Sequence, residues 1–256
     1  MNIHSKTISE IRSLLEDQET VPEQLLAAMN RDRRAGVKKL LTRYYRQQEF
    51  LRRKREKAEM MLIEEKNLWS QGYSFLGGID EAGRGPLAGP VVSACVILPE
   101  GFCLDGVDDS KKLSSEKREI LYDIICKKAV AVGIGIADHN QIDKVNIYNA
   151  TVESMIQAVN ACSRQPDYLL IDAMRLNKIS LPQLSIIGGD AKSQSIAAAS
   201  VVAKVTRDRI MDGFAKLYPE YGFDRHKGYG TKEHISAIRT YGLSPIHRQS
   251  FLTKIL

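Results

Sequence analysis

Cysteine is scarce in this sequence, and its positions form no pattern. Four cysteines occur in 256 residues, without a Cys-x-x-Cys pair or histidines at ligand spacing: Cys95, Cys103, Cys126 and Cys162. This excludes a zinc motif and a disulfide framework. Apolar runs of about 18 residues or more are also missing, so we expect no membrane span. Residues 1–6 lack the apolar segment of a secretory signal, which makes the cytoplasm the expected location.

Three common nucleotide-site and hydrolase motifs are absent as well. The Walker pattern requires glycine before its lysine, and Gly188–Ser193 has Ala191 at that place. A dinucleotide-binding Gly-x-Gly-x-x-Gly is not met by Gly83–Gly89, where the third glycine comes one position late and Pro86 stands in the turn. No Gly-x-Ser-x-Gly occurs. These absences argue against a P-loop enzyme, a dinucleotide site and a serine hydrolase.

Residues 1–70 contain almost no glycine and only one proline, Pro22, which predicts a helical arm. We expect helices over 7–15, from about 20–24 onward, and over 31–70. Between residues 31 and 57 there are twelve lysines and arginines against three acids, and the whole chain has a net charge of +6. Such a face is either solvated or binds nucleic acid. Membrane-surface binding ranks last because the apolar face is thin.

The stretch 75–92 carries the clearest indication of a functional site in this sequence. Its apolar run, Phe75–Ile79, predicts a buried strand that ends in Asp80 and Glu81, and glycines then break the chain. Consecutive strand residues point to opposite faces, so the two acids converge only if the strand bends at once. The plainer interpretation is two solvent-facing acids beside an ordinary turn.

The remaining pattern predicts an α/β protein. Three strands precede the long helix expected over 146–162, which favours an antiparallel meander. Ser114 and Thr231 are expected to cap helices. The expected strands are 75–79, 91–98, 129–137, 168–172 and 184–187, and the expected helices are 115–128, 146–162, 193–217 and 232–241.

Three of these strands lead to acids: Asp80-Glu81, Asp172 and Asp190. Strand ends in an open α/β sheet gather ligands at one edge. Four carboxylates without histidine or cysteine suit Mg²⁺ or Mn²⁺, and two such ions support in-line phosphoryl chemistry. Taken singly, Asp172 can be a turn residue and Asp190 a helix cap.

Six blocks of this sequence resemble type 2 ribonuclease H, the ribonuclease HII family. The resemblance spans about residues 75–251, and the basic arm lies outside it. The blocks are Gly78–Pro86, Asp109–Leu113, Ile171–Ala173, Gly189–Lys192, Ser195–Asp208 and His226–Thr231.

The resemblance implies a ribonuclease-H-like fold: a mixed five-stranded sheet flanked by helices, with a helical C-terminal extension. It implies a monomeric endonuclease that cuts the RNA strand of RNA·DNA hybrids and cuts at single ribonucleotides in duplex DNA, leaving 3′-hydroxyl and 5′-phosphate ends. The family's metal ligands match Asp80, Glu81, Asp172 and Asp190. Its ribose-contacting segment matches Gly83-Arg84-Gly85, and its junction tyrosine matches Tyr229. Expected roles are ribonucleotide excision and RNA primer removal.

Backbone at two glycines can approach a ribose closely, and a 2′-hydroxyl is what separates RNA from DNA. Lys111, Lys112, Lys204 and Lys227 are candidates for phosphate contacts, although Lys204 can equally be a surface lysine. The expected division is 1–72 arm, 73–217 catalytic core and 218–256 C-terminal extension. Two other functions stay open: an architectural nucleic-acid-binding protein, and another metal-dependent nuclease such as a junction resolvase.

Overall fold

The computed structural model describes residues 3, 5–16, 21–104, 107 and 113–253. The chain divides into two compact units, Met1–Lys57 and Ala58–Leu256. The boundary predicted at residue 72 is a division by sequence character, and it stays a prediction.

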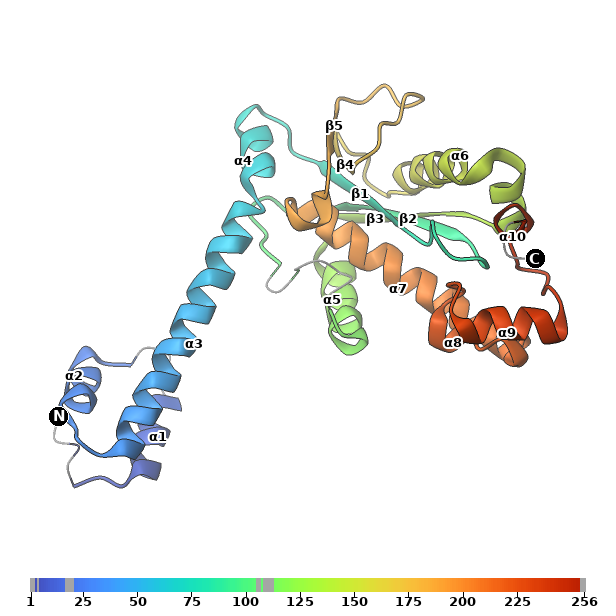
Figure 1. Ribbon diagram of the computed structural model, residues 1–256. Coiled ribbons are helices and arrows are strands. Elements are labelled where there is room, and N and C mark those ends of the chain that lie inside the picture. The colour runs from blue at the N-terminus through green and yellow to red at the C-terminus, as the bar shows by residue number, and fades with distance from the viewer. Residues whose placement is uncertain (1–2, 4, 17–20, 105–106, 108–112, 254–256) are drawn as a thin grey trace. The chain divides into compact units, whose positions relative to one another are not determined.

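The first unit is helical. It contains α1 (Ile8–Glu16), α2 (Glu23–Arg31) and most of α3 (Ala35–Met60) (Figure 1). Its small core is built from buried Ile11, Leu25, Met29 and Val37 together with neighbouring apolar residues. The α2–α3 connection is fixed by Arg34, whose guanidinium pairs with Asp32 at 2.7 Å.

The single helix predicted over 31–70 is wrong, because the chain forms two helices there. After α3, the short helix α4 covers Ile63–Ser70. Met61 and Leu62, between the two helices, are buried, and the carbonyl of Met61 accepts a hydrogen bond from Gln194 N–H at 3.0 Å. Burying this apolar pair turns the chain away from the helix axis.

The sheet confirms the predicted mixed five-stranded architecture. Its order is β3-β2-β1-β4-β5, antiparallel for β1–β2 and β2–β3 and parallel for β1–β4 and β4–β5. The meander expected for the first three strands is therefore confirmed. The strands are β1 (Leu76–Ala82), β2 (Val91–Ile97), β3 (Ala131–Ala137), β4 (Tyr168–Asp172) and β5 (Gln183–Ile186).

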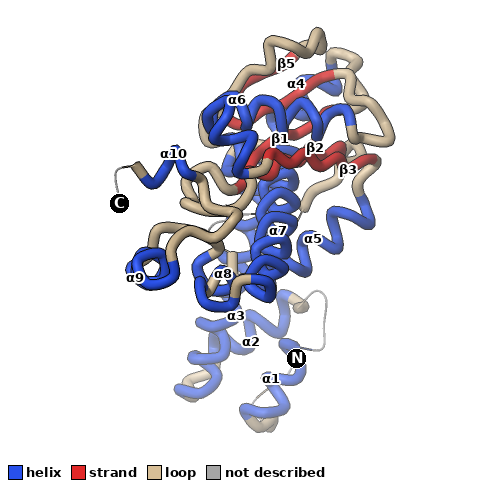
Figure 2. Tube along the Cα trace, turned by 90° about the vertical axis from the view of Figure 1, so that its right-hand side faces the viewer, coloured by secondary structure: helices blue, strands red, loops and turns tan. Residues whose placement is uncertain are grey.

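Helices cover both faces of the sheet (Figures 1 and 2). On one face lies α7 (Gln194–Leu217) with α5 (Ser115–Lys128) beside it, and on the other lies α6 (His139–Asn160). The backbone of α7 comes so close to β1 that a Cβ on Gly78 would stand 2.1 Å from the carbonyl carbon of Ser195. This glycine therefore allows the helix to pack directly on the strand.

The helix caps predicted at Ser114 and Thr231 are confirmed, since each side chain accepts a backbone N–H at its helix start. The helix predicted over 146–162 begins earlier, at His139, and is interrupted at Asn146 (φ 67°). Asn146 tolerates this left-handed conformation, and its side-chain oxygen accepts a hydrogen bond from Asn149 N–H at 3.1 Å.

The C-terminal extension consists of short helical segments after α7. The remaining elements are η1 (Gly189–Ala191), η2 (Pro219–Tyr221), α8 (Phe223–His226), α9 (Lys232–Tyr241) and α10 (Gln249–Leu252).

Among the helices that the structure describes, none is long and apolar enough to cross a membrane.

Candidate active site

Asp80 lies near the end of β1 and is buried against α7. Its Oδ1 accepts a hydrogen bond from the N–H of Glu81 at 2.7 Å. Burial, above all, raises the pKa of this carboxyl well above its ordinary value. The nearby charges of Glu81 and Asp172 raise the pKa further, and a hydrogen bond with Ser200 opposes them. A buried, crowded carboxyl of this kind indicates a functional site rather than a turn.

Asp172 and Asp190 come to the same edge of the sheet from two consecutive segments. Asp172 ends β4, and Ala173 (φ 48°) turns the chain away immediately afterwards. One carboxylate oxygen of Asp172 accepts the N–H of Gly189 at 2.8 Å. This bond ties the end of β4 to η1, which carries the buried Asp190. Three of the four predicted carboxylates are thereby brought to one region.

Glu81 is placed differently from the other three acids. A bend directly after Asp80 was the condition for the two acids to converge, and β1 instead stays paired with β2 through Ala82, which lies opposite Val92. Consecutive residues of a strand alternate in direction, so Glu81 does not enter the site in the same way as Asp80. Glu81 pairs with Arg84 at 3.3 Å, and its charge still acts on Asp80.

The carboxylate set fits a divalent cation by its chemistry. Its donors are all carboxylate oxygens, as Mg²⁺ and Mn²⁺ prefer. The burial and repulsion that raise the pKa of Asp80 are what a bound cation would relieve. As the side chains are placed, no group of three or more His, Cys, Asp or Glu within the described part of the chain is compact enough to hold a metal ion.

The loop that follows β1 is held by Arg248, near the C-terminus. Its guanidinium donates to three backbone carbonyls: Gly83 O at 2.6 Å, Arg84 O at 3.0 Å and Gly89 O at 2.8 Å. The side chain is fully buried, and this burial lowers the pKa of Arg248. Arg248 therefore fixes the carbonyl side of the predicted ribose-contacting segment.

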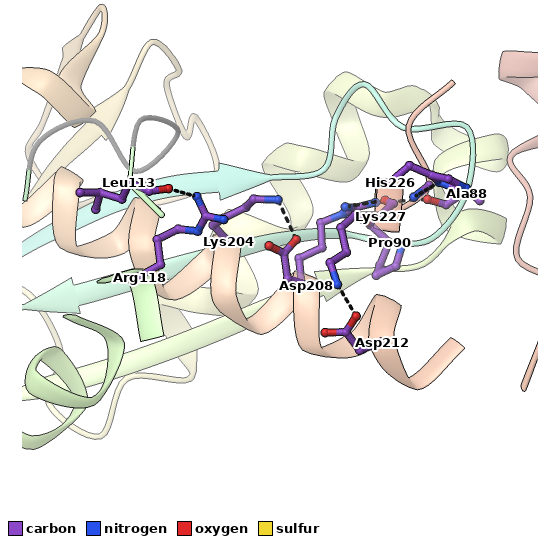
Figure 3. Close-up of polar contacts among 11 residues, drawn as sticks. Ala88, Pro90, Leu113, Arg118, Lys204, Asp208, Asp212, His226 and Lys227 are labelled. Atoms are coloured by element: carbon purple, nitrogen blue, oxygen red, sulfur yellow. Dashed lines mark hydrogen bonds and ion pairs between the residues drawn. The ribbon is translucent and has the colours of Figure 1, made fainter. Parts of the chain in front are cut away.

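Arg207 of α7 holds the other end of the same loop. It donates to Pro90 O at 2.9 Å, Ala88 O at 3.2 Å and Lys227 O at 3.0 Å, and Figure 3 labels these three partners. Gly83 (φ 96°) makes room for it, because a Cβ there would stand 2.0 Å from the Arg207 Nε. Only glycine combines this backbone conformation with this close approach.

Tyr229 stands beside the glycine-rich segment. The atom nearest to a Cβ built on Gly85 is the Tyr229 ring carbon Cε1, at 3.8 Å, and the Tyr229 side chain is 46% exposed. Its segment is anchored by a hydrogen bond from Leu87 N–H to Gly228 O at 2.8 Å. The exposed Arg84, Gly85 and Tyr229 thus form one open surface next to the carboxylates' strand.

The predicted lysines differ in their surroundings. Lys204 donates to Asp208 at 2.7 Å, and burial lowers the pKa of Lys204 (Figure 3). Lys227 pairs with Asp212. Each is already bound to a carboxylate, so a phosphate would have to compete for it. Lys111 and Lys112 lie outside the described residues.

Sequence reasoning missed Arg207 and Arg248. A signal for Arg207 existed: it lies on the buried stripe of α7, four residues after Ala203 and four before Met211. Arg248 has no comparable local signal, because its partners lie about 160 residues earlier in the chain.

Carboxylates at adjoining strand ends of this mixed sheet define a nuclease of the ribonuclease-H-like class. The comparisons with known proteins are more specific. The ribonuclease HII family model matches residues 77–254, and the model of the ribonuclease HII N-terminal domain matches residues 7–69. The chain belongs to the ribonuclease HII family. It is therefore a ribonuclease H, an endonuclease acting on RNA·DNA hybrids.

Individual relatives agree with this assignment. The ribonuclease HII of Lactobacillus delbrueckii is 53% identical over 95% of this chain and 94% of its own length. The ribonuclease H2 structure from Pyrococcus horikoshii is 26% identical with a TM-score of 0.59, covering 68% of this chain and 92% of that one. The structure of Bst-RNase HIII in complex with Mn²⁺ (18% identical, TM-score 0.54, 70% and 67% covered) shares the fold.

One expectation about the arm is wrong. The resemblance was expected to leave the basic arm outside the family, but a family model covers residues 7–69 and the L. delbrueckii relative aligns over nearly the whole chain. The arm lacks the sequence blocks that distinguish the catalytic region, so its membership was not evident from motifs.

Proposed function

We propose that Asp80, Glu81, Asp172 and Asp190 hold two divalent cations, Mg²⁺ or Mn²⁺, and that the chain cuts RNA·DNA hybrids and single ribonucleotides embedded in duplex DNA. The observation that carries this proposal is the buried Asp80 carboxyl, crowded by Glu81 and Asp172. When bound, such cations activate a water and stabilise the leaving oxygen. The products would carry 3′-hydroxyl and 5′-phosphate ends. A ribonuclease HIII of the same fold has been crystallised with Mn²⁺.

Recognition of the ribonucleotide is assigned to the loop after β1. Arg248 binds the carbonyls of Gly83 and Arg84, and the exposed side of the segment, at Gly85 and Tyr229, then faces substrate. Backbone without a side chain can lie close to a ribose, where its polar groups can bind the 2′-hydroxyl. The Tyr229 ring offers a surface on which a sugar or base can stack. This arrangement supports selection for a 2′-hydroxyl.

The lysines have a supporting role in this proposal. Lys204 and Lys227 lie along α7 and at the end of α8, each held by an aspartate, and would exchange that partner for a phosphate oxygen. Lys111 and Lys112 are retained on sequence grounds alone. The cellular roles in ribonucleotide excision and primer removal, the cytoplasmic location and the monomeric state remain predictions.

The decisive test is a cleavage assay on labelled duplex DNA that holds one ribonucleotide, with an all-DNA duplex and an RNA·DNA hybrid as controls, in Mg²⁺ and in Mn²⁺. Cutting at the single ribonucleotide and in the hybrid would support the proposed substrates. Loss of this cutting in Asp80→Asn would support the proposed metal site. Cutting of the all-DNA duplex would instead indicate a structure-specific DNA nuclease. Cutting of the hybrid alone would refute the single-ribonucleotide assignment.

A further inference from the structure

One face of α3 carries exposed cations that pair with no carboxylate among the residues that the structure describes. Lys39, Arg43 and Arg46 follow one another at spacings of four and three residues, which places them in a row along the helix. None of these three side chains has a hydrogen bond or ion pair with a carboxylate in the described part of the chain, and all three are exposed. Phe50 extends the row by four residues and is 67% exposed. We call these four residues the basic face.

The basic face lies on the side of α3 opposite its buried side. Val37, Leu40 and Leu41 point into the core of the first unit. At 3.6 residues per turn, the row from Lys39 to Phe50 lies roughly opposite these three positions. The basic face therefore points away from the core of the unit. From Lys39 to Phe50 it extends roughly 16 Å along the helix axis.

The charge of the face is not explained by the stability of the helix. Like charges three and four residues apart repel one another and destabilise a helix. Further along α3, two cations are compensated: Arg52 pairs with Glu49 and Glu56, and Arg53 pairs with Glu49. Within the described ranges of the chain, the basic face shows no such ion pair, so its charge is available to a partner.

We infer that the basic face binds the phosphate backbone of a nucleic-acid duplex, as a second contact apart from the carboxylate site. Neighbouring cations of the row are separated by roughly 6 Å or less along the helix axis. This separation is comparable with the distance between phosphates along one strand of a duplex. Phe50 continues the row as an aromatic surface for sugar or base edges. The inference rests on the substrate being a duplex, as proposed above.

An anionic membrane is the poorer partner. Binding at a membrane surface requires a broad apolar face next to the charges. The apolar side of α3 is used by the core of the unit, and the basic face offers only Phe50. A lone aromatic ring among cations suits a wet, polyanionic groove better than an acyl layer.

Binding of the full-length protein to a 30-base-pair duplex with one ribonucleotide tests the inference, measured by fluorescence anisotropy in EDTA from 50 to 200 mM salt. For K39Q/R43Q/R46Q we expect a dissociation constant at least about tenfold higher at 50 mM salt. The slope of log K against log salt should fall by up to about 2.7, since each lost phosphate contact removes about 0.9. Phe50→Ala should weaken binding with little change in the slope.

A matched variant separates a directional contact from general charge attraction. K38Q/R52Q/R55Q removes three cations from the same helix, at exposed positions off the basic face. It should keep near wild-type affinity and slope. Equal losses in the two triple variants, or no loss in K39Q/R43Q/R46Q, would overturn the inference.

Three further readouts complete the test. The melting temperature of K39Q/R43Q/R46Q should not fall, because like-charge repulsion is relieved. Its kcat in Mg²⁺ at saturating substrate should be unchanged while KM rises. Loss of binding to phosphatidylserine vesicles, with duplex binding intact, would assign the face to membranes and overturn the inference. If the wild type cuts nothing yet binds duplex through this face, the proposed function fails and the inference stands.

Discussion

Replacing Arg248 by glutamine tests whether the loop after β1 depends on the C-terminal segment. The guanidinium donates to the carbonyls of Gly83, Arg84 and Gly89, at 2.6 to 3.0 Å, and is fully buried. Glutamine is shorter and cannot satisfy three carbonyls that lie around one planar group. At least two of these acceptors should then be left buried without a donor.

Two opposing contributions determine how much Arg248→Gln lowers the free energy of unfolding. Each orphaned carbonyl costs about 1–3 kcal/mol, so two or three of them cost on the order of 5 kcal/mol. Removing the cation relieves the burial penalty that lowers the pKa of Arg248, and this offsets part of the loss. We expect a net destabilisation of about 3 kcal/mol. For a folded unit of this size, this corresponds to a fall in melting temperature of roughly 6–12 °C.

The assay combines thermal unfolding with cleavage kinetics. Arg209→Gln is the matched control, because Arg209 is half-exposed, pairs with Glu119 at the surface, and should change stability by less than about 0.5 kcal/mol. Arg248→Lys keeps the charge but not the planar fork, and should be intermediate. In Arg248→Gln the KM for a single-ribonucleotide duplex should rise more than the KM for a long hybrid, since loop placement matters most where one ribose is read.

An Arg248→Gln protein that melts within about 2 °C of wild type and keeps its KM for both substrates would refute a positioning role for Arg248. That outcome would mean the carbonyls find other donors and the guanidinium is not what positions the loop. A large fall in melting temperature without any change in KM would limit Arg248 to stability.

Three other results are expected. Asp80→Asn should reduce cleavage more than about a hundredfold without lowering the melting temperature, because it removes a carboxyl whose pKa burial already raises; near-normal Mg²⁺-dependent activity would contradict the site. Tyr229→Ala should raise the KM for the single-ribonucleotide duplex about tenfold or more, whereas Tyr241→Ala, an exposed tyrosine of α9, should not. Burial lowers the pKa of His234 to about 4, so the unfolded chain gains a proton near pH 6.5 while the folded one does not. The free energy of unfolding from urea titrations should therefore fall between pH 6.5 and 4, by up to about 3 kcal/mol, and His234→Gln should flatten this fall.

Features that depend on nearby residues were predicted well from the sequence. Ser114 and Thr231 cap the helices that follow them because a hydroxyl three residues before a backbone N–H is a local arrangement. The end of β4 at Asp172 was visible because the apolar run stops there, whereas β1 continues two residues beyond Asp80, to Ala82. The antiparallel meander followed from the order of these elements.

Features that depend on distant contacts were not predicted. The break after α3 arises because Met61 is buried and hydrogen-bonded to α7, more than 130 residues later. β1 continues past Asp80 because it stays paired with β2 through Ala82, which lies opposite Val92. The partner of Met61 is far along the chain, and local propensity carries no information about it.

The distinction between local and distant contacts also applies to the proposed site, where the carboxylates and the segment assigned to the ribose are held in different ways. The carboxylates lie at the ends of sheet elements, where Asp80 and Asp172 are held by strand pairing and by one bond to Gly189. The segment assigned to the ribose has no such support of its own. Its carbonyls at Gly83 and Arg84 are bound by Arg248 of the C-terminal tail, while Arg207 of α7 binds the carbonyls of Ala88 and Pro90 at the other end of the same loop. Burial lowers the pKa of both arginines. The proposed metal ligands thus depend on the sheet, whereas the proposed selection for a ribonucleotide depends on the C-terminal segment being packed in place.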